Sequence, residues 1–378
     1  MPPRLLYVVS EDWAFLSHRL PMARAARAAG FEVHVATRVD RGKREIEAEG
    51  FTVHHIQFSR GRISPLATLR TIRSLARTVA AVQPHVTHHI AVQSSILGSL
   101  AALGTRSACL NGINGLGFTF TSTNAKARLL RPILGAAIRR LLNRARARTL
   151  VQNPDDRAAL IRLGVSAQSI ALIPGSGVDV KALTPLPEPD GPLTIGFAGR
   201  LLDDKGIRPL VQAVRRMRAK GSQVVLLIAG AADPANPSSI PQAEIDGWRE
   251  AGAIEWLGQL TDIRHLWRRC HVASLPSRRE GLPMALLEAA ACGRAMIATD
   301  VPGCREVAIQ GETGLLVPVD DSDALAAAIE RLDRDPALRR AFAARARVLA
   351  ETRFASTLIE RDIGRLYGEM LATSGQVG

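Results

Sequence analysis

The sequence predicts an α/β protein with two domains of similar construction. The 378 residues exceed what a single hydrophobic core usually serves. Short apolar segments alternate with amphipathic helical segments through most of the chain, which is typical of parallel sheets covered by helices on both faces. The proline-rich stretch TPLPEPDGP at 184–192 indicates a linker. We therefore expect domains at 1–184 and 185–355, followed by a C-terminal helix at 356–378 that returns to the first domain.

The alternation can be followed element by element. The strands expected in the first half are 4–9, 31–36, 51–56, 86–90, 107–111, 149–152 and 170–173, with helices at 18–29, 65–82, 95–103 and 126–148. The strands expected in the second half are 193–198, 224–229, 254–257, 272–275, 295–298 and 314–317, with helices that include 285–291, 324–332 and 354–371. Ligands of such sheets bind beyond the carboxyl ends of the strands, so the residues after each strand are the candidates for a site.

The positive charge of the chain lies almost entirely in the first half. The net charge is +14, residues 1–190 carry +13 of it, and segment 50–154 contains no acidic residue. The first domain is therefore expected to face an anionic partner: membrane headgroups, a lipid diphosphate or nucleic acid. Segment 126–148 combines an apolar stripe with eight basic residues, which suits a helix on an anionic membrane surface. A packed helix with a solvated basic face fits this composition equally well.

The cysteines and the apolar segments indicate the cellular compartment of the protein. The four cysteines are far apart and form no CxxC pair, which favours reduced thiols in the cytoplasm over disulfides or a zinc site. No segment resembles a signal peptide or a membrane-spanning helix. The acidic run at 320–323 contains a DxD pattern, but it directly precedes an apolar-periodic segment, so helix capping explains it better than a metal does. We expect no metal site.

The stretch PSRREGLPMALLEAAACG at 276–293 is the most informative in the chain. It follows a predicted strand, Pro283 is expected at the first position of a helix, and the final Cys-Gly ends that helix. A helix N-terminus binds anions such as phosphate through its unpaired N–H groups. Glu280 precedes this end and Glu288 lies on its flank, which indicates a ligand that carries hydroxyls as well as phosphate. Taken alone, the two residues fit ordinary solvated carboxylates better.

Other candidates also follow predicted strands. The glycine turn GRLLDDKG at 199–206 carries Arg200 and Lys205 between a strand and a helix, a weak phosphate-binding signal that is neither a P-loop nor GxGxxG. In the first half, His88 and His89 adjoin one another in a strand, so their side chains point to opposite faces and at most one faces a ligand. Either histidine could instead be structural, and the glycines at 115 and 117 could be turn residues.

Together these motifs resemble retaining glycosyltransferases of family 4, which have the GT-B fold: two Rossmann-like domains whose parallel sheets face each other across a cleft. The resemblance spans nearly the whole chain. In the first half it extends to members that build bacterial surface polysaccharides on polyprenyl-diphosphate carriers. The motifs of the second half are FAGRL (197–201), DKG (204–206), LGQL (257–260), the 276–288 stretch, GCRE (303–306) and GETGLLV (311–317), and those of the first half are FLSHRLP (15–21), the histidine pair and GLG (115–117).

This resemblance implies residue roles. The donor would be a nucleotide sugar, most simply a UDP-sugar, bound by the second domain without a metal or other cofactor. Arg200 and Lys205 would neutralise its diphosphate. Glu280 would contact the donor sugar, and Glu288 the ribose hydroxyls. The donor-binding set implied is Arg200, Lys205, Gly258, Leu260, Glu280, Gly281, Leu282, Met284 and Glu288; the catalytic set is Glu280, His89, Arg200 and Lys205; the acceptor region includes His18, His88, Gly115 and Gly117.

We therefore expect a hexosyl- or N-acetylhexosaminyltransferase that acts with retention on a lipid-linked or polysaccharide acceptor. The basic domain would hold it on the cytoplasmic face of the cell membrane. A UDP-sugar epimerase on a similar fold is the alternative, and it would form a new UDP-sugar epimer without any acceptor. A nucleic-acid-binding protein would also explain the charge and would bind with a steep salt dependence, but no recognition motif supports it, so no nucleic-acid partner is expected.

Overall fold

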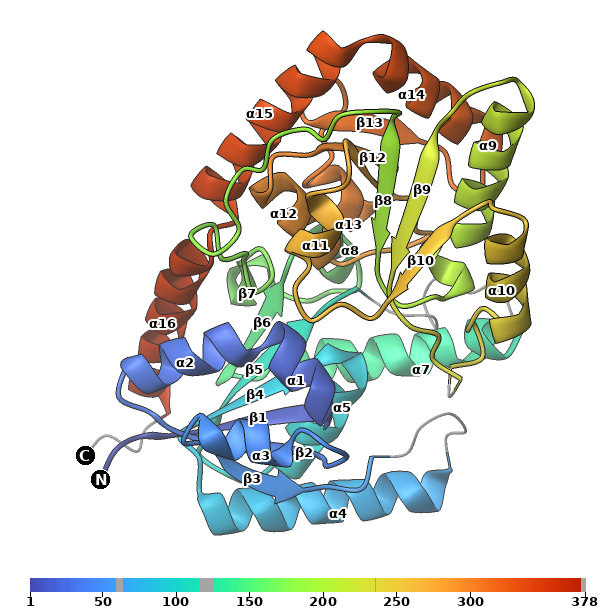
Figure 1. Ribbon diagram of the computed structural model, residues 1–378. Coiled ribbons are helices and arrows are strands. Elements are labelled where there is room, and N and C mark those ends of the chain that lie inside the picture. The colour runs from blue at the N-terminus through green and yellow to red at the C-terminus, as the bar shows by residue number, and fades with distance from the viewer. Residues whose placement is uncertain (59–63, 116–124, 235, 375–378) are drawn as a thin grey trace. The chain divides into compact units, whose positions relative to one another are not determined.

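The computed structural model describes residues 1–58, 64–115, 125–234 and 236–374, with only the backbone described for 125–131. The chain forms two compact units, Met1–Ser176 with Thr357–Gly378, and Gly177–Ser356, each built on one parallel sheet (Figure 1). The boundary precedes the proline-rich linker because the intervening segment packs within the second unit. There Val178 N donates to Phe354 O at 2.8 Å, and Arg347 donates to the carbonyl oxygens of Val180 and Leu183.

The sheet of the first unit has the strand order β3-β2-β1-β4-β5-β6-β7, and every neighbouring pair is parallel. All seven expected strands are present. Buried side chains alternate between the two faces of the sheet, as in Leu5 and Tyr7 against Leu6 and Val8 of β1. The strands are β1 (Arg4–Glu11), β2 (Glu32–Arg38), β3 (Thr52–His55), β4 (Val86–Ile90), β5 (Ala108–Ile113), β6 (Ala147–Val151) and β7 (Ile170–Leu172).

Helices cover both faces of this sheet. Residues of α1, α2, α3 and the C-terminal helix α16 share one core cluster with one face of β1, while α4 and α5 share another with the opposite face. The last helix of the chain therefore packs in the first unit. The helices are α1 (Asp12–His18), α2 (Leu20–Ala28), α3 (Lys43–Ala48), α4 (Pro65–Val82), α5 (Ala91–Ala101), α7 (Ala125–Leu142), α8 (Pro154–Arg162) and α16 (Ser356–Thr373), and η1 (Ala167–Ser169) is a 3-10 turn.

Several helix predictions for this unit were wrong in extent. The helix expected at 18–29 is α2, which runs from Leu20 to Ala28; His18 instead ends the preceding helix α1, because Pro21 lacks the N–H that would continue that helix. The helix expected at 95–103 begins earlier, at Ala91 of α5. The basic helix expected at 126–148 ends at Leu142. Its last predicted residues belong instead to β6, where Ala147 and Thr149 are buried, so sheet formation overrides the helical pattern.

The sheet of the second unit has the order β10-β9-β8-β11-β12-β13, also parallel throughout. One continuous apolar core joins it to the surrounding helices. The strands are β8 (Thr194–Ala198), β9 (Val225–Ala229), β10 (Glu255–Gly258), β11 (Val272–Leu275), β12 (Ala295–Thr299) and β13 (Gly314–Val317). The helices are α9 (Ile207–Ala219), α10 (Gln242–Glu250), α11 (Arg264–Trp267), α12 (Met284–Ala291), α13 (Pro302–Arg305), α14 (Ser322–Arg334) and α15 (Pro336–Arg353), with a 3-10 turn η2 (Asp203–Lys205).

Both sheets share one topological feature. The first three strands of each unit run outward from β1 or β8, and the next strand, β4 or β11, returns to the other side of that first strand. Such a reversal of strand order leaves a crevice at the carboxyl ends, where open α/β sheets bind ligands. The fold therefore marks the loops after β1 and β4, and after β8 and β11, as the places to look for sites.

Two further expectations concern thiols and membranes. All four cysteines are buried and unpaired, as expected for reduced thiols. Among the helices in the described ranges, none is long and apolar enough to pass through a lipid bilayer.

Candidate functional site

The switch point of the second unit carries the residues predicted to bind the donor. Strand β8 leads into the loop that holds Arg200 and Lys205, and β11 leads into the loop that holds Glu280. The two strands are neighbours in the sheet, paired at Ile195 and Val272, so their loops emerge side by side. The fold thus brings together two segments that the sequence marks separately.

Lys205 and Glu280 form the closest contact between these loops. Lys205 Nζ lies 2.5 Å from Glu280 Oε1, with only 23% and 10% of the two side chains exposed. Ser277 Oγ donates to the same oxygen at 2.7 Å. In the described part of the chain, the other carboxylate oxygen of Glu280 accepts no hydrogen bond. The carboxylate is therefore held firmly by one oxygen, while the other remains able to accept a hydroxyl from a ligand.

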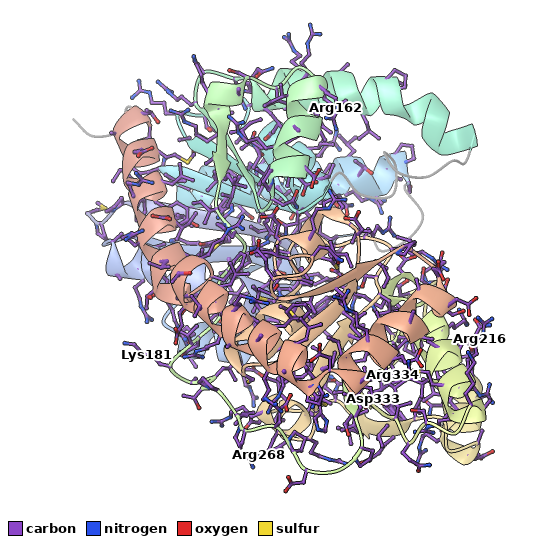
Figure 2. The ribbon with its side chains drawn as sticks, turned by 90° about the horizontal axis from the view of Figure 1, so that it is seen from above. Arg162, Lys181, Arg216, Arg268, Asp333 and Arg334 are labelled. Carbon is purple, nitrogen blue, oxygen red and sulfur yellow. The ribbon has the colours of Figure 1, made fainter. Side chains whose placement is uncertain are left out.

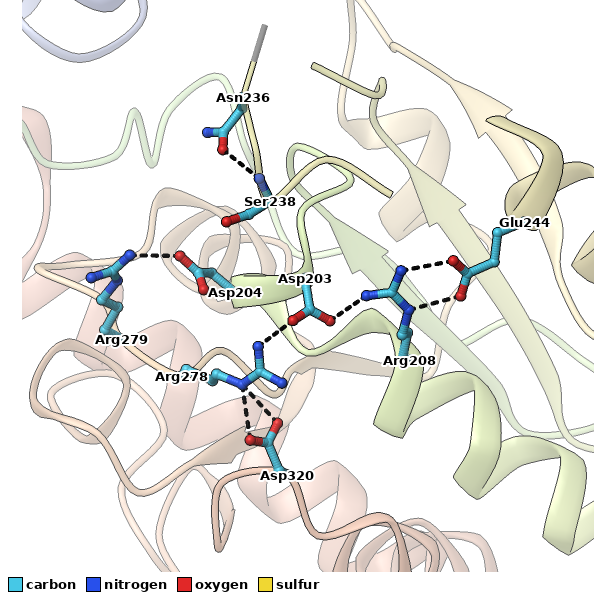
Figure 3. Close-up of polar contacts among 9 residues, drawn as sticks. All are labelled: Asp203, Asp204, Arg208, Asn236, Ser238, Glu244, Arg278, Arg279 and Asp320. Carbon is cyan, nitrogen blue, oxygen red and sulfur yellow. Dashed lines mark hydrogen bonds and ion pairs between the residues drawn. The ribbon is translucent and has the colours of Figure 1, made fainter. Parts of the chain in front are cut away.

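Two more ion pairs fasten the same two segments (Figure 3). Arg278 pairs with Asp203, and Arg279 Nη2 lies 2.6 Å from Asp204 Oδ2. The backbone N–H of Arg278 donates to Asp204 O at 2.9 Å. Because Lys205 directly follows this pair of aspartates, and Glu280 directly follows the two arginines, the ion pairs fix where Lys205 meets its carboxylate partner.

The network extends beyond these loops in both directions (Figure 3). Arg208 of α9 binds Asp203 at 2.5 Å and holds Glu244 of α10 through two hydrogen bonds of 2.8 and 2.7 Å. On the other side, Arg278 Nε contacts both carboxylate oxygens of Asp320. Burial alone would raise the pKa of Asp203, but hydrogen bonds from its two arginines outweigh this effect and lower it. Single exposed ion pairs stabilise little, whereas shared charges across four elements fix loop geometry.

Gly206 makes the close approach of the two loops possible. Its φ is +70°, in the left-handed region, and a Cβ at this position would lie only 1.9 Å from the carbonyl oxygen of Pro276. Only glycine meets both conditions without moving the backbone. The glycine of the DKG motif is therefore required by the packing of the loop after β8 against the loop after β11.

Helix α12 begins at Met284, one residue later than predicted, so Pro283 occupies the N-cap position. The N–H groups of Leu286 and Leu287 both donate to Pro283 O. Those of Met284 and Ala285 make no hydrogen bond within the described residues, which leaves two donors for an anion at this end. The predicted end of the helix is confirmed, since α12 stops at Ala291 before Cys292.

Glu288 lies one turn into α12 and is unusual among the carboxylates of the chain. It is half-buried, and no cation or hydrogen-bond donor contacts its carboxylate in the ranges that the structure describes. Burial raises its pKa from the usual 4.5 to about 7. A carboxylate that is buried without a partner costs stability, and such groups concentrate at functional sites.

Arg200 has a carboxylate partner of its own. Its Nη1 lies 3.0 Å from Asp233 Oδ2, and 46% and 29% of the two side chains are exposed. Asp233 belongs to the loop between β9 and α10, and its backbone N–H donates to Ser239 Oγ. Both cations predicted to meet the diphosphate are therefore paired with carboxylates in this structure.

The remaining predicted donor residues lie near the same edge of the sheet. Gly258 ends β10, and Leu260 packs half-buried against the core in the loop that follows. Gly281 lies in the loop before α12, while Leu282 and Met284 are half-buried against the core. Their proximity to a base, phosphate or sugar stays a prediction.

The acidic run at 320–323 serves the fold. Asp321 accepts hydrogen bonds from the N–H groups of Asp323 and Ala324 and so caps α14, as the sequence predicts. Asp320 pairs with Arg278. Within the described ranges, no group of three or more His, Cys, Asp or Glu residues is suited to hold a metal ion.

In the first unit, His88 and His89 point to opposite faces of β4, as predicted, and both are fully buried. His89 Nδ1 lies 2.9 Å from Asn111 Oδ1, and its ring is so close to α5 that a Cβ at Gly98 would lie 2.4 Å from it. Burial lowers the pKa of His89 to about 4, so the ring is neutral at pH 7. This environment favours packing over contact with a substrate, and the catalytic role of His89 stays a prediction.

His88 belongs to a buried polar cluster on the other face. Its Nδ1 lies 2.8 Å from the hydroxyl of Tyr367 in α16, and that hydroxyl lies 2.5 Å from the hydroxyl of Tyr7 in β1. Arg19 is also buried nearby: its Nη1 donates to Ser176 Oγ, and burial lowers its pKa to about 10. The cluster ties the last helix of the chain to the central strands of the sheet.

The other predicted acceptor residues are less informative. His18 ends α1 and is exposed, and its carbonyl oxygen accepts a hydrogen bond from Ser176 Oγ. Gly115 has a φ of +87° in the turn after β5, which fits the turn interpretation. Gly117 lies outside the described residues.

Each of the two units matches a known protein family. The model of the family described as "Glycosyl transferase 4-like" matches residues 4–153, and that of "Glycosyl transferases group 1" matches residues 192–335. The chain is a glycosyltransferase of these families. Its two matched segments fall within the two structural units, and its GT-B fold is as the resemblance predicts.

Individual relatives of the glycosyltransferase are distant. An N,N'-diacetylbacillosaminyl-diphospho-undecaprenol alpha-1,3-N-acetylgalactosaminyltransferase of Campylobacter jejuni is 26% identical over 348 residues, which is 86% of this chain and 90% of the relative. Among solved structures, a sucrose-phosphate synthase of Thermosynechococcus elongatus has a TM-score of 0.81 at 23% identity and covers 98% of this chain and 99% of that one. HepE of Anabaena in complex with UDP-glucose has a TM-score of 0.77 at 18% identity, over 97% and 99% of the two chains.

Sequence reasoning missed several residues that organise the glycosyltransferase. Asp203 was assigned to a turn, and Arg278 had no assigned role, although together they lock the two loops of the switch point. Asp233, the partner of Arg200, carried no motif. Tyr367 was missed as well, yet it was one of only two tyrosines in the chain, and its place in a C-terminal apolar helix could have drawn attention to it.

Proposed function

We propose that this glycosyltransferase moves a sugar from a UDP-sugar, with retention of anomeric configuration, to a polyprenyl-diphosphate-linked or polysaccharide acceptor of bacterial surface-glycan synthesis. The proposal assigns donor binding to the second unit and needs no metal ion or other cofactor. The observation that carries it is the contact of Lys205 with Glu280 at the switch point, beside the open N-terminus of α12. A cation, a hydroxyl-accepting carboxylate and an anion-binding helix end are together the groups that a sugar diphosphate requires.

The physical argument concerns the leaving group. When the bond between sugar and diphosphate breaks, negative charge grows on the phosphate oxygens. Fixed cations and oriented N–H groups stabilise that charge most when they are already in place before the reaction. Lys205 and the amides of Met284 and Ala285 meet this condition, and Arg200 adds a second cation once Asp233 releases it. Glu280 would then accept a hydroxyl of the sugar, and Glu288 the hydroxyls of the ribose.

The donor base and the acceptor rest on likeness. The Campylobacter relative is named for a lipid-diphosphate acceptor and an N-acetylgalactosaminyl group, and the Anabaena neighbour is in complex with UDP-glucose. We therefore propose a UDP-linked donor and a lipid-diphosphate acceptor. The acid-free segment 50–154 favours an anionic membrane surface as a further partner, which would hold the protein on the cytoplasmic face of the cell membrane.

Two experiments test the proposal. In the first, the melting temperature is measured with UDP-, GDP- and ADP-sugars, because a ligand that binds only the folded state raises it. In the second, turnover of the stabilising donor with a bacterial lipid extract is compared between wild type, Glu280→Ala and Glu255→Ala. Glu255 lies in the same unit and makes an exposed ion pair with Arg269, so it is the matched control. Loss of turnover is expected only for Glu280→Ala, with folding intact by circular dichroism.

Several outcomes would overturn this assignment. Near-wild-type turnover in Glu280→Ala would remove the donor-site assignment. A new UDP-sugar epimer in the absence of acceptor would make the protein an epimerase. Tight duplex binding that falls steeply with salt, without stabilisation by any nucleotide sugar, would favour a nucleic-acid-binding function. An inverted anomeric configuration in the product, seen by NMR, would reject retention alone.

A further inference from the structure

A groove in the first unit is lined by three arginines and, among the described residues, by no acidic side chain. It lies between α7 and the end of α8 and has a volume of about 960 Å³. Its α7 residues follow helical spacing, so they form one face of that helix. The lining residues are Pro132, Gly135, Ala136, Arg139 and Arg140 from α7 and Asn143 directly after it, with Arg162 and Leu163 from the end of α8 (Figure 2 labels Arg162).

The three guanidinium groups have no partner within the part of the chain that the structure describes. Arg139, Arg140 and Arg162 are all exposed, and none makes a hydrogen bond or ion pair there. Their neighbours in sequence differ, since Arg144 and Arg146 donate to backbone carbonyl oxygens at 3.3 and 3.5 Å. Three unpaired guanidinium groups around one groove repel each other, so an anion between them is favoured.

The groove is held in shape by Asn143. Its Nδ2 donates to Gly164 O at 2.8 Å, and its Oδ1 accepts a hydrogen bond from Ser166 N at 2.8 Å. These two bonds fix α7 against the turn that follows α8, and they therefore fix the arginines of α7 relative to Arg162. Arg162 also complements the negative end of the α8 dipole, but this role accounts for only one of the three charges.

Apolar side chains beside the groove favour a bilayer as the source of the anion. Ile133 of α7 is 66% exposed and, at a spacing of seven residues, shares a side of the helix with Arg140. Ile161, next to Arg162, is 38% exposed. Exposed apolar residues beside basic ones are typical of surfaces that lie in the headgroup region of a membrane.

We propose that Arg139, Arg140 and Arg162 bind the phosphate of an anionic phospholipid headgroup at a bilayer surface. The inference rests on the membrane partner of the proposed function and specifies it by residue. Each guanidinium can donate two parallel hydrogen bonds to phosphate oxygens, which a flexible ammonium group cannot. The site adds Arg162, from a separate helix, to the basic segment that the sequence marks.

Vesicle co-sedimentation of the full-length protein tests the proposal. Binding is measured to phosphatidylglycerol–phosphatidylcholine vesicles and to phosphatidylcholine alone, for wild type, for Arg139→Ala/Arg140→Ala/Arg162→Ala and for Arg70→Ala/Arg73→Ala/Arg77→Ala. The second triple variant removes the same charge from exposed positions of α4 in the same unit. The affinity of the groove variant for anionic vesicles is expected to fall at least tenfold. It would fall about 100-fold if each arginine contributes about 1 kcal/mol to binding. The α4 variant is expected to lose much less.

The outcomes separate this inference from the proposed function. If both triple variants lost vesicle binding to the same extent, net charge alone would explain membrane binding, and the groove would be rejected as a specific site. A second outcome would show that the groove does not bind a bilayer. In it, soluble inositol hexakisphosphate raises the melting temperature of wild type but not of the groove variant, while wild type shows no preference for anionic vesicles. If the groove variant misfolds, Arg162→Glu alone is tested, and unchanged vesicle binding would refute the site. Stabilisation by a UDP-sugar, measured in parallel, reports the donor site and should be the same in every variant.

Discussion

Replacing Glu288 with glutamine should make the protein more stable above neutral pH. The carboxylate has no partner among the described residues, and burial raises its pKa from 4.5 to about 7. In the unfolded chain the group ionises near 4.5, so between these two values the folded state holds a proton that the unfolded state has lost. The stability of the folded state therefore falls as pH rises through this window, and the full cost is present above pH 7.

The size of this cost follows from the shift. One pKa unit corresponds to about 1.4 kcal/mol, so the shift sets an upper bound of roughly 3 kcal/mol. Partial exposure of the side chain lowers the expected value to about 1–2 kcal/mol. Urea unfolding of wild type and Glu288→Gln should show that difference near pH 8, in favour of the variant, and almost none near pH 3.5, where the carboxyl group is protonated in both states.

Glu188 provides the matched control. It is partly buried like Glu288, but it is paired with Arg339 at 2.7 Å. Burial would raise the pKa of Glu188, and the hydrogen bonds from Arg339 outweigh this and lower it. Glu188→Gln should therefore destabilise the protein near pH 8. The reasoning would be refuted if Glu288→Gln were less stable than wild type near pH 8, because its carboxylate would then have a stabilising partner.

The same variant should bind the donor more weakly. A ribose hydroxyl donates to an ionised carboxylate about twice as strongly as to a neutral amide, so the affinity for UDP in Glu288→Gln should fall roughly tenfold or more. For wild type, affinity should rise between pH 6 and 8 as Glu288 ionises, and this dependence should disappear in the variant. Gains in stability that accompany losses in binding are typical of residues kept for function. Isothermal titration calorimetry measures both effects.

Three further changes have defined outcomes. Asp233→Asn should strengthen UDP binding severalfold in calorimetry, because the diphosphate no longer competes with a carboxylate for Arg200; unchanged affinity would mean that Arg200 does not meet the donor. Gly206→Ala should lower the melting temperature and abolish turnover, since its Cβ would collide with the carbonyl oxygen of Pro276; wild-type activity would reject the required close approach. Tyr367→Phe should cost about 1–3 kcal/mol in urea unfolding, because it removes a hydroxyl shared by two buried partners, yet leave UDP binding intact.

The strand order explains which parts of the site could be predicted from the sequence. Each strand is a compact apolar segment, so local patterns were sufficient to find all thirteen strands of the described residues. Lys205 and Glu280 were each recognised from their own motif. Their contact could not be, because the two residues are 75 positions apart in the sequence and meet only since β8 and β11 are neighbours in the sheet. The same holds for Asp203, whose arginine partners lie on two other elements.

The burial of His89 is a second feature that the strand pattern does not predict. A histidine near the carboxyl end of a strand is well placed for a ligand, and the pattern gave no sign of burial. What buries it is Gly98, which lets α5 approach the ring so closely that a methyl group would not fit. Similarly, the basic helix α7 was extended too far, because its pattern continued into residues that the sheet needs as β6. In both cases packing between distant segments decided the outcome.

The charges at the donor edge imply how a diphosphate would enter. Arg200 is paired with Asp233 and Lys205 with Glu280, so each of the two cations already has a carboxylate partner before an anion arrives. One carboxylate must therefore give way. The pair of Arg200 and Asp233 is the more exposed and costs little to break. The pair of Lys205 and Glu280 is more buried and is held by Ser277 and the flanking arginine–aspartate pairs. We therefore expect Arg200 to exchange its partner for the diphosphate, while Lys205 stays beside Glu280 and serves both phosphate and sugar.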